Sequence, residues 1–305
     1  MKNPRFLPYF LLVILTLIWG SSFILMKQGL KVLVPMQLVG VRLGIASIAL
    51  SPFMFHFFKS VKKEDWKWII ISGIVGNGFP AFLFATAQQK IPSAQAGILN
   101  ALSPLFVVIM SRVLFGAKFP AGKIIGIVVG LCGAVLILAR NGGAFDFGEN
   151  FQYGLLIVLA TIGYGISASI MKYRLSHAPA EMVSSFAISM AGIPALFYLF
   201  LGTPFIAVLT EKPGAWLATF YIVILGVMGT GIALILFNRL LKLKDVVFAS
   251  SVTYLMPLVA LSWGLGSGES FGLTQAIGLF LIIAGVYLMS FKRVATLQFS
   301  ENENQ

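Results

Sequence analysis

The sequence predicts an all-α integral membrane protein with ten transmembrane helices, and three observations support this prediction. Charge-free apolar runs of about 20 residues recur ten times along the 305 residues, and each is long enough to cross a hydrocarbon core as a helix. Hydrophobic residues make up 58% of the chain and charged residues only 10%, with a mean hydropathy of +0.94. All ten acidic residues fall between the runs or at their ends. Little chain is left for a soluble domain.

The expected spans follow the apolar runs in chain order. In the first half they run from Leu7 to Met26, Pro35 to Phe58, Trp66 to Gln88, Ser93 to Phe115 and Ala121 to Ala139. In the second half they run from Phe151 to Met171, Glu181 to Leu201, Ala215 to Phe237, Val246 to Gly266 and Gly272 to Phe291. Because the connections are short, nearly all of the polar backbone can be satisfied within helices, as the bilayer demands.

The first apolar run also has a feature of secretory signals, because Lys2 and Arg5 precede it. The run continues through Trp19 and Ser22 without a small-residue cleavage site, and it has a counterpart later in the chain. We therefore expect the run to remain as a membrane helix.

The basic residues predict the topology. If the amino terminus is cytoplasmic, the inner loops and tails carry 16 lysines and arginines and the outer loops carry 5. This positive-inside bias predicts that both termini are cytoplasmic. The net charge of +12 then lies against the inner leaflet, where it favours contact with anionic lipid rather than with nucleic acid.

The two halves of the chain match each other position by position. The pairs are Trp19 with Tyr164, Ser22 with Ser167, Lys27 with Lys172, Phe84 with Phe237, Pro104 with Pro257, Gly126 with Gly278 and Gly133 with Gly285, and Gly73-x-x-Gly76-x-Gly78 recurs as Gly226-x-x-Gly229-x-Gly231. Because each half has an odd number of spans, the halves are expected to be inverted repeats around a central cavity, as in transporters that work by alternating access. The predicted units are residues 1–144 and 145–294, followed by a short cytoplasmic tail at 295–305.

These motifs resemble those of the EamA family in the drug/metabolite transporter superfamily. The resemblance rests on the Trp-Gly-x-Ser start at Trp19, the glycine-rich third span, Ser103-Pro104 in the fourth, and the Gly268-Glu269 step before the last span. It covers nearly the whole chain in two copies, and it implies ten helices, inverted repeats, a central cavity and export of amino acids or other small metabolites. One departure is that Ala117 stands in the first copy where Glu269 stands in the second.

Arg42 is the ionisable residue that lies within a predicted span, some 10 Å below the outer surface at about 1.5 Å per residue. Ionisable residues inside the membrane are costly and mark functional sites. The guanidinium of Arg42 is therefore a candidate clamp for a carboxylate or phosphate. The alternative is that it reaches outward to the interface or holds backbone carbonyls at a helix break.

Polar and aromatic residues near the midplane are the other candidates for substrate binding. They are Trp19, Ser22, Asn77, Asn100, Tyr164, Ser167, Thr253 and Tyr254. An amide or hydroxyl in lipid needs partners, so interhelical bonding is the alternative for each polar one. Trp19 and Tyr164 occupy equivalent places, where they form either a stacking surface for a ligand or ordinary core packing.

Pro104 and Pro257 are candidate flex points, because each removes a backbone hydrogen bond within a span. The alternative is a static kink. The glycines of the third and eighth spans do not form a nucleotide-binding loop, since no strand precedes them, and close helix packing explains them better.

Enzymatic and metal chemistry are not expected. Cys132 stands alone, and His56 and His177 lie far apart in the sequence at the cytoplasmic edges, without the spacing of a catalytic or ligating set. We therefore expect no cofactor and no bound metal. A carboxylate relay at the midplane is not expected either, although Glu181, Asp245 and Glu269 at span ends remain candidates for proton coupling.

The sequence thus predicts a secondary transporter of the bacterial inner membrane that exports a small metabolite such as an amino acid. Arg42 favours a carboxylate-bearing solute, and the aromatic pair favours a partly apolar one. An exporter of hydrophobic cations is an alternative, but it would need a buried carboxylate. A channel or a non-transporting scaffold is an alternative of another class.

Overall fold

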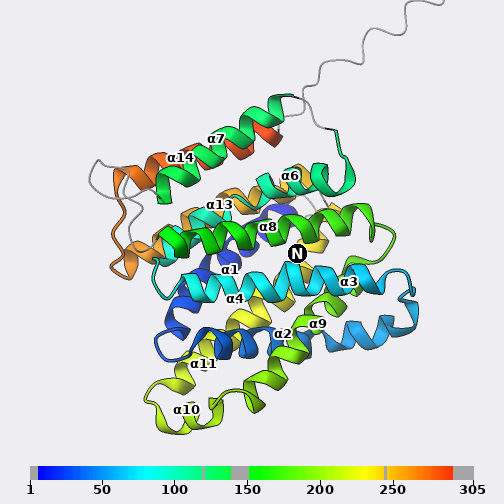
Figure 1. Cartoon of the computed structure of the whole chain (residues 1–305), viewed down its shortest axis with the longest axis vertical. Helices are drawn as coiled ribbons and strands as arrows, with labels where there is room; N and C mark the ends of the chain where they lie inside the picture. The colour runs from blue at the N-terminus through cyan, green and yellow to red at the C-terminus, as the bar shows by residue number, and fades with distance from the viewer. Residues whose placement is uncertain (1–5, 119–120, 139–150, 244–245, 291–305) are drawn as a thin grey trace, which may run out of the picture.

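The computed structural model describes residues 6–118, 121–138, 151–243 and 246–290, and the secondary structure of these residues is entirely helical. Figure 1 shows the helices side by side, most of them running across the longest axis of the molecule. The predicted boundary at 144/145, the tail at 295–305 and Asp245 lie outside the described residues.

The helices follow the predicted spans closely. In the first half they are α1 (Leu7–Gly29), α2 (Pro35–Phe57), α3 (Trp66–Gly73), α4 (Phe79–Ala87), α5 (Ser93–Asn100), α6 (Ser103–Phe115) and α7 (Ala121–Leu138), with a 3-10 turn, η1 (Phe58–Ser60), after α2. In the second half they are α8 (Phe151–Tyr173), α9 (Ala180–Leu201), α10 (Phe205–Glu211), α11 (Ala215–Ile224), α12 (Ala233–Leu243), α13 (Val246–Gly266) and α14 (Leu273–Ser290).

Seven helical stretches among the described residues are long and apolar enough to cross a membrane. They correspond to the predicted spans one to four and six to eight. The other three predicted spans correspond to α7, α13 and α14, which contain the apolar stretches Ile124–Leu138, Val252–Gly266 and Leu273–Leu288. The short helix α10 was not predicted. The all-helical membrane fold is therefore confirmed, while the count of ten crossings stays a prediction.

The third and eighth spans each contain a π-helical segment at the glycine motif. These segments are η2 (Ile74–Gly78), between α3 and α4, and η3 (Leu225–Ile232), between α11 and α12. The glycines permit close helix approach: a Cβ on Gly73 would lie 2.3 Å from the Ala187 carbonyl oxygen, and one on Gly226 would lie 2.7 Å from that of Arg42. The packing role expected for these glycines is confirmed.

The two prolines act differently on their spans. The fourth span breaks after Asn100, and α6 begins at Ser103. Pro104 has no N–H to offer the Asn100 carbonyl, and the Ser103 hydroxyl donates to that oxygen instead, at 2.7 Å. Pro257 lies inside the continuous helix α13. Equivalent prolines thus give a break in one half and an unbroken helix in the other.

Equivalent helices of the two halves pack against each other in opposite directions. In the α2–α9 pair, Gly40 approaches Leu199 and Gly44 approaches Leu196. In the α7–α14 pair, which lies at one end of the molecule in Figure 1, Gly126 approaches Gly285 and Gly133 approaches Gly278. Residue numbers rise along one helix as they fall along its partner, so the pairs are antiparallel, as inverted repeats require.

The first helix of each half packs against helices of the other half. Helix α1 packs against α11, α12 and α13, whereas α8 packs against α3, α4 and α6. The contacts repeat in detail: Gly20 of α1 meets Val259 of α13, and Gly165 of α8 meets Phe106 of α6. Two groups of helices result, one around α1 and one around α8, and α2 and α9 each contact helices of both groups.

Candidate functional site

Arg42 lies about two turns into α2, and its side chain is half-buried. Its Nε is buried without a hydrogen-bond partner among the described residues, although part of the side chain stays accessible. A buried donor on a charged group costs free energy when it is unpaired. Arg42 therefore has hydrogen-bonding capacity left for a ligand, and its part in substrate binding stays a prediction.

Two aromatic pairs, related by the repeat, lie close to this region. The ring of Tyr164 stacks on Phe84 with centroids 6.0 Å apart, and Trp19 lies 5.3 Å from Phe237. Tyr164 also lies close enough to Arg42 for the two polar ends to interact electrostatically. Both Trp19 and Tyr164 are half-buried. Tyr164 thus lies beside the cation, whereas a stacking surface for a ligand stays a prediction, and the sequence analysis missed the two phenylalanines that pack on the pair.

The indole of Trp19 is tied to the π segment η3. Its Nε1 donates to the Gly229 carbonyl oxygen at 2.8 Å. The wider π turn changes which carbonyls are paired within the helix, and an outside donor can then take one of them. Trp19 therefore has a structural task in addition to the predicted ligand contact.

We predict that Trp19→Phe lowers the free energy of unfolding by about 1–3 kcal/mol, because the buried Gly229 carbonyl loses its donor. Thermal unfolding in detergent would measure this. The matched control is Trp263→Phe, whose exposed indole donates to the Ser21 hydroxyl, a group that can turn to its own helix instead. An equal loss in both variants would contradict the role of the Trp19 bond.

The two predicted serines lie where α1 and α8 touch the π segments. Ser22 donates to the Ile18 carbonyl at 2.9 Å and lies against Gly229. Ser167 is hydrogen-bonded to Ser72 and lies against Gly76. Both serines are buried. These contacts favour helix packing, and a part in substrate binding stays a prediction.

The remaining predicted residues are half-buried and spread along the bundle. Asn77 lies in η2 and donates from Nδ2 to the Ser72 carbonyl at 3.2 Å. Asn100 lies at the break before α6. Thr253 and Tyr254 lie in α13, and both interact with neighbouring groups. Sequence analysis missed Thr230, the counterpart of Asn77, whose buried hydroxyl has no partner among the described residues.

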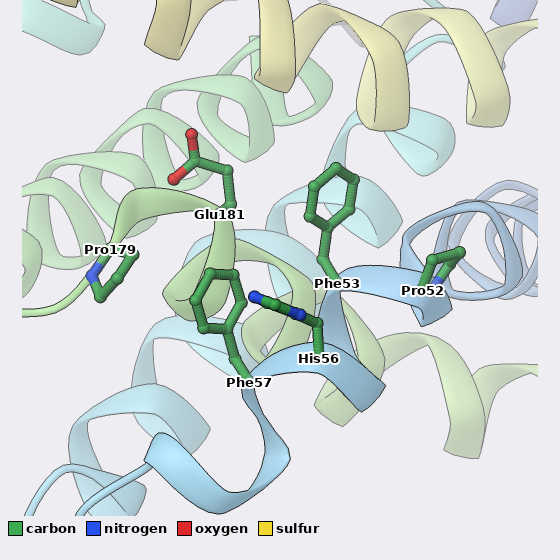
Figure 2. A pocket seen from close by; sticks show the side chains of 6 residues that line it. All are labelled: Pro52, Phe53, His56, Phe57, Pro179 and Glu181. Carbon is green, nitrogen blue, oxygen red and sulfur yellow. The ribbon is translucent and has the colours of Figure 1, made fainter.

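A cavity of about 600 Å³ lies at the far end of α2 from its start, between that end and the beginning of α9. Figure 2 shows the side chains that line it, which are Pro52, Phe53, His56, Phe57, Pro179 and Glu181. Phe53 is 11 residues beyond Arg42, or about 16 Å along the helix. In the predicted topology, this is the cytoplasmic end. The described residues contain no group of three or more His, Cys, Asp or Glu that could hold a metal ion.

Comparison with known proteins agrees with this architecture. The model of the EamA-like transporter family matches residues 6–139 and again residues 152–291. One solved crystal structure superposes with a TM-score of 0.61 at 23% identity, covering 92% of this chain and 95% of the other, which shows the fold alone.

Relatives of known or inferred activity are transporters. The uncharacterized transporter YoaV of Bacillus subtilis is 26% identical over 92% of this chain and 95% of its own. The aromatic amino acid exporter YddG of Ancylobacter novellus is 28% identical over 66% and 67%. A probable amino-acid metabolite efflux pump of Salmonella typhimurium is 25% identical over 92% and 94%. Since the family model matches most of the chain, in two copies, this protein belongs to the EamA-like transporter family and is a multi-pass transporter of the plasma membrane, not an enzyme.

Proposed function

We propose that this protein exports a small carboxylate-bearing metabolite of the amino-acid class. The observation that supports this most directly is the guanidinium of Arg42, whose Nε is buried and has no hydrogen-bond partner among the described residues. Arginine binds carboxylates through two parallel charge-assisted hydrogen bonds. The names of two relatives, an aromatic amino acid exporter and an amino-acid metabolite efflux pump, point to the same class.

The aromatic pairs define the rest of the proposed solute. With its carboxylate on Arg42, a solute would have the Tyr164–Phe84 pair beside it and the Trp19–Phe237 pair on the related helices. Aromatic faces favour apolar or aromatic groups. A hydrophobic cation would meet Arg42 without a compensating acid, because all ten acidic residues lie between the apolar runs or at their ends. This charge balance favours an acid over a cation.

Transport would proceed by alternating access between the two inverted halves, across ten spans with both termini in the cytoplasm. The antiparallel pairs α2–α9 and α7–α14 support the inverted arrangement, and the 16 to 5 distribution of basic residues supports the orientation. The helix groups around α1 and α8 are the two bodies that would rock, with Arg42 between them in α2.

Two linked measurements test the proposal. Metabolite profiling of the medium from cells that lack or overproduce the protein would identify exported acids. The strongest candidate acid and its amide would then be compared in counterflow across proteoliposomes containing the purified protein. We expect counterflow of the acid and none of the amide, because the amide cannot form the paired charge-assisted bonds. Equal counterflow of both compounds would contradict a carboxylate site.

A further inference from the structure

The outer half of the fourth span is seated on the opposite helix group. Helix α5 packs chiefly against α13 and makes smaller contacts with both α1 and α8, whereas α6, the continuation of the same span, packs chiefly against α8. The seat is tight: a Cβ on Gly97 would lie 2.4 Å from the Ala260 Cβ and 3.2 Å from the Phe23 ring. The fourth span thus bridges the two helix groups, and it changes sides at the Ala101–Leu102 break.

Glu269 clasps the amino-terminal end of α5 to the loop that follows α13. Its carboxylate accepts hydrogen bonds from the Ser93 backbone N–H at 2.7 Å, the Ser93 hydroxyl at 2.8 Å and the Ala94 N–H at 2.9 Å. Ser93 is completely buried. A carboxylate at a helix amino terminus satisfies orphan donors and complements the helix dipole. Three charge-assisted bonds therefore hold α5 in its seat.

A second clasp joins α1 to the loop before α5. Lys27 Nζ donates to the carbonyl oxygens of Gln88 at 2.9 Å and Ile91 at 3.2 Å. The Gln88 side chain donates back to the Phe23 carbonyl at 3.0 Å. Lys27 lies in the last turn of α1 and Glu269 in the loop after α13, so both clasps lie at the outer end in the predicted topology.

The opposite end of the molecule carries the cavity lined by α2 and α9. The cavity in Figure 2 is lined by residues from the end of α2 and the start of α9, and α2 is 23 residues long, so about 30 Å of helix lies between the clasped end and this cavity. The sequences of the two halves also differ at the position of the Glu269 clasp. The position equivalent to Glu269 is Ala117 in the first half, so no second carboxylate is available for the matching clasp.

We propose that α5 is the outer gate of the transporter and that Glu269 is its latch, with the structure in the inward-facing state. Opening to the outside then requires the Glu269 carboxylate to leave the amino terminus of α5. It also requires α5 to swing about the Ala101–Leu102 break, where Pro104 has already removed a helix hydrogen bond. This inference rests on the alternating-access mechanism proposed above, and it assigns Glu269 a gating role rather than contact with the solute.

The test reads the two ends separately and needs no solute. Two single-cysteine reporters are made in a Cys132→Ser background: Pro52→Cys in the inner cavity, and Ser93→Cys under the latch, where both backbone bonds to Glu269 are kept. The whole protein is placed in nanodiscs, which expose both faces, and the rate of modification by a polar maleimide is measured at each reporter. Each reporter is combined with Glu269→Ala or with the control Glu211→Ala, which removes an exposed carboxylate at the same end.

We expect Glu269→Ala to raise the rate at position 93 by at least about tenfold, since a lost charge-assisted hydrogen bond is worth a factor of this order. The rate at position 52 should fall in the same variant, because the inward-facing population is depleted, and Glu211→Ala should change neither rate. In Glu269→Gln, the modification rate at position 93 should lie between those of the unchanged protein and Glu269→Ala, because the amide oxygen can still accept a hydrogen bond.

Two results would overturn the latch. One is an unchanged rate at position 93 in Glu269→Ala. The other is a rise at both reporters together, which would indicate general loosening instead of an exchange of states. Because no solute is present, a wrong assignment of the solute class leaves this experiment unaffected, and failure of the latch leaves the counterflow test intact.

Discussion

Replacing Arg42 with alanine is expected to abolish export while leaving the protein folded. A bidentate arginine–carboxylate contact comprises two charge-assisted hydrogen bonds of about 1.5–3 kcal/mol each. Their loss would weaken binding of the solute by a factor of about 100 or more. The fold loses no bond made by Nε, because that donor has no partner among the described residues. Stability should therefore hold or rise slightly as a buried charge is removed.

Efflux from preloaded proteoliposomes would measure the loss of export, and thermal unfolding of the same preparations would show whether the protein stays folded. Arg42→Lys should retain little export, since an ammonium keeps the charge but not the planar fork. The control is Arg112→Ala, which removes an exposed arginine near the end of α6. Unchanged efflux in Arg42→Ala would remove this residue from the site. A large drop in melting temperature would instead favour the alternative in which Arg42 holds backbone carbonyls.

The span boundaries could be predicted because they depend on local quantities. Hydropathy and length place a helix from Pro35 to Phe57 whatever its neighbours are. The internal structure of the third and eighth spans depends on partners instead. Gly229 accepts the Trp19 indole from a helix 210 residues earlier in the chain, and this contact accompanies the π segment. No local pattern beyond the spacing of the glycines indicates it. Helix α10 was missed because seven residues give too short a pattern.

For the candidate site too, local features could be predicted from the sequence, and contacts between distant residues could not. Arg42 could be identified from the sequence because a cation inside an apolar run is rare and costly. The sequence could not show that Tyr164 would lie beside it, or that Ser22 and Ser167 would be occupied by helix contacts. Glu269 shows the limit most clearly. The sequence makes it a candidate for proton coupling at the end of a span, but does not show that its partner is Ser93, 176 residues away.

Close packing between α7 and α14 leads to the largest expected effect on stability. A Cβ on Gly285 would lie 2.5 Å from both the Gly126 carbonyl oxygen and the Gly130 backbone nitrogen. Backbone atoms of a neighbouring helix cannot turn aside as a side chain can, so the helices must separate. We predict that Gly285→Val lowers the free energy of unfolding by about 3 kcal/mol, at the upper end of overpacking costs.

Thermal unfolding in detergent would rank this variant against two controls. Gly130→Ala should cost less, because its nearest neighbour is the flexible tip of Leu105, and Gly266→Ala should be nearly neutral, because nothing lies within 4 Å of its Cβ position. The inverted repeat adds a sharper requirement. Gly133 is the counterpart of Gly285 and meets the Gly278 carbonyl oxygen at 2.7 Å, so Gly133→Val should cost about as much. A large cost at one glycine and none at the other would contradict antiparallel packing of two equivalent helices.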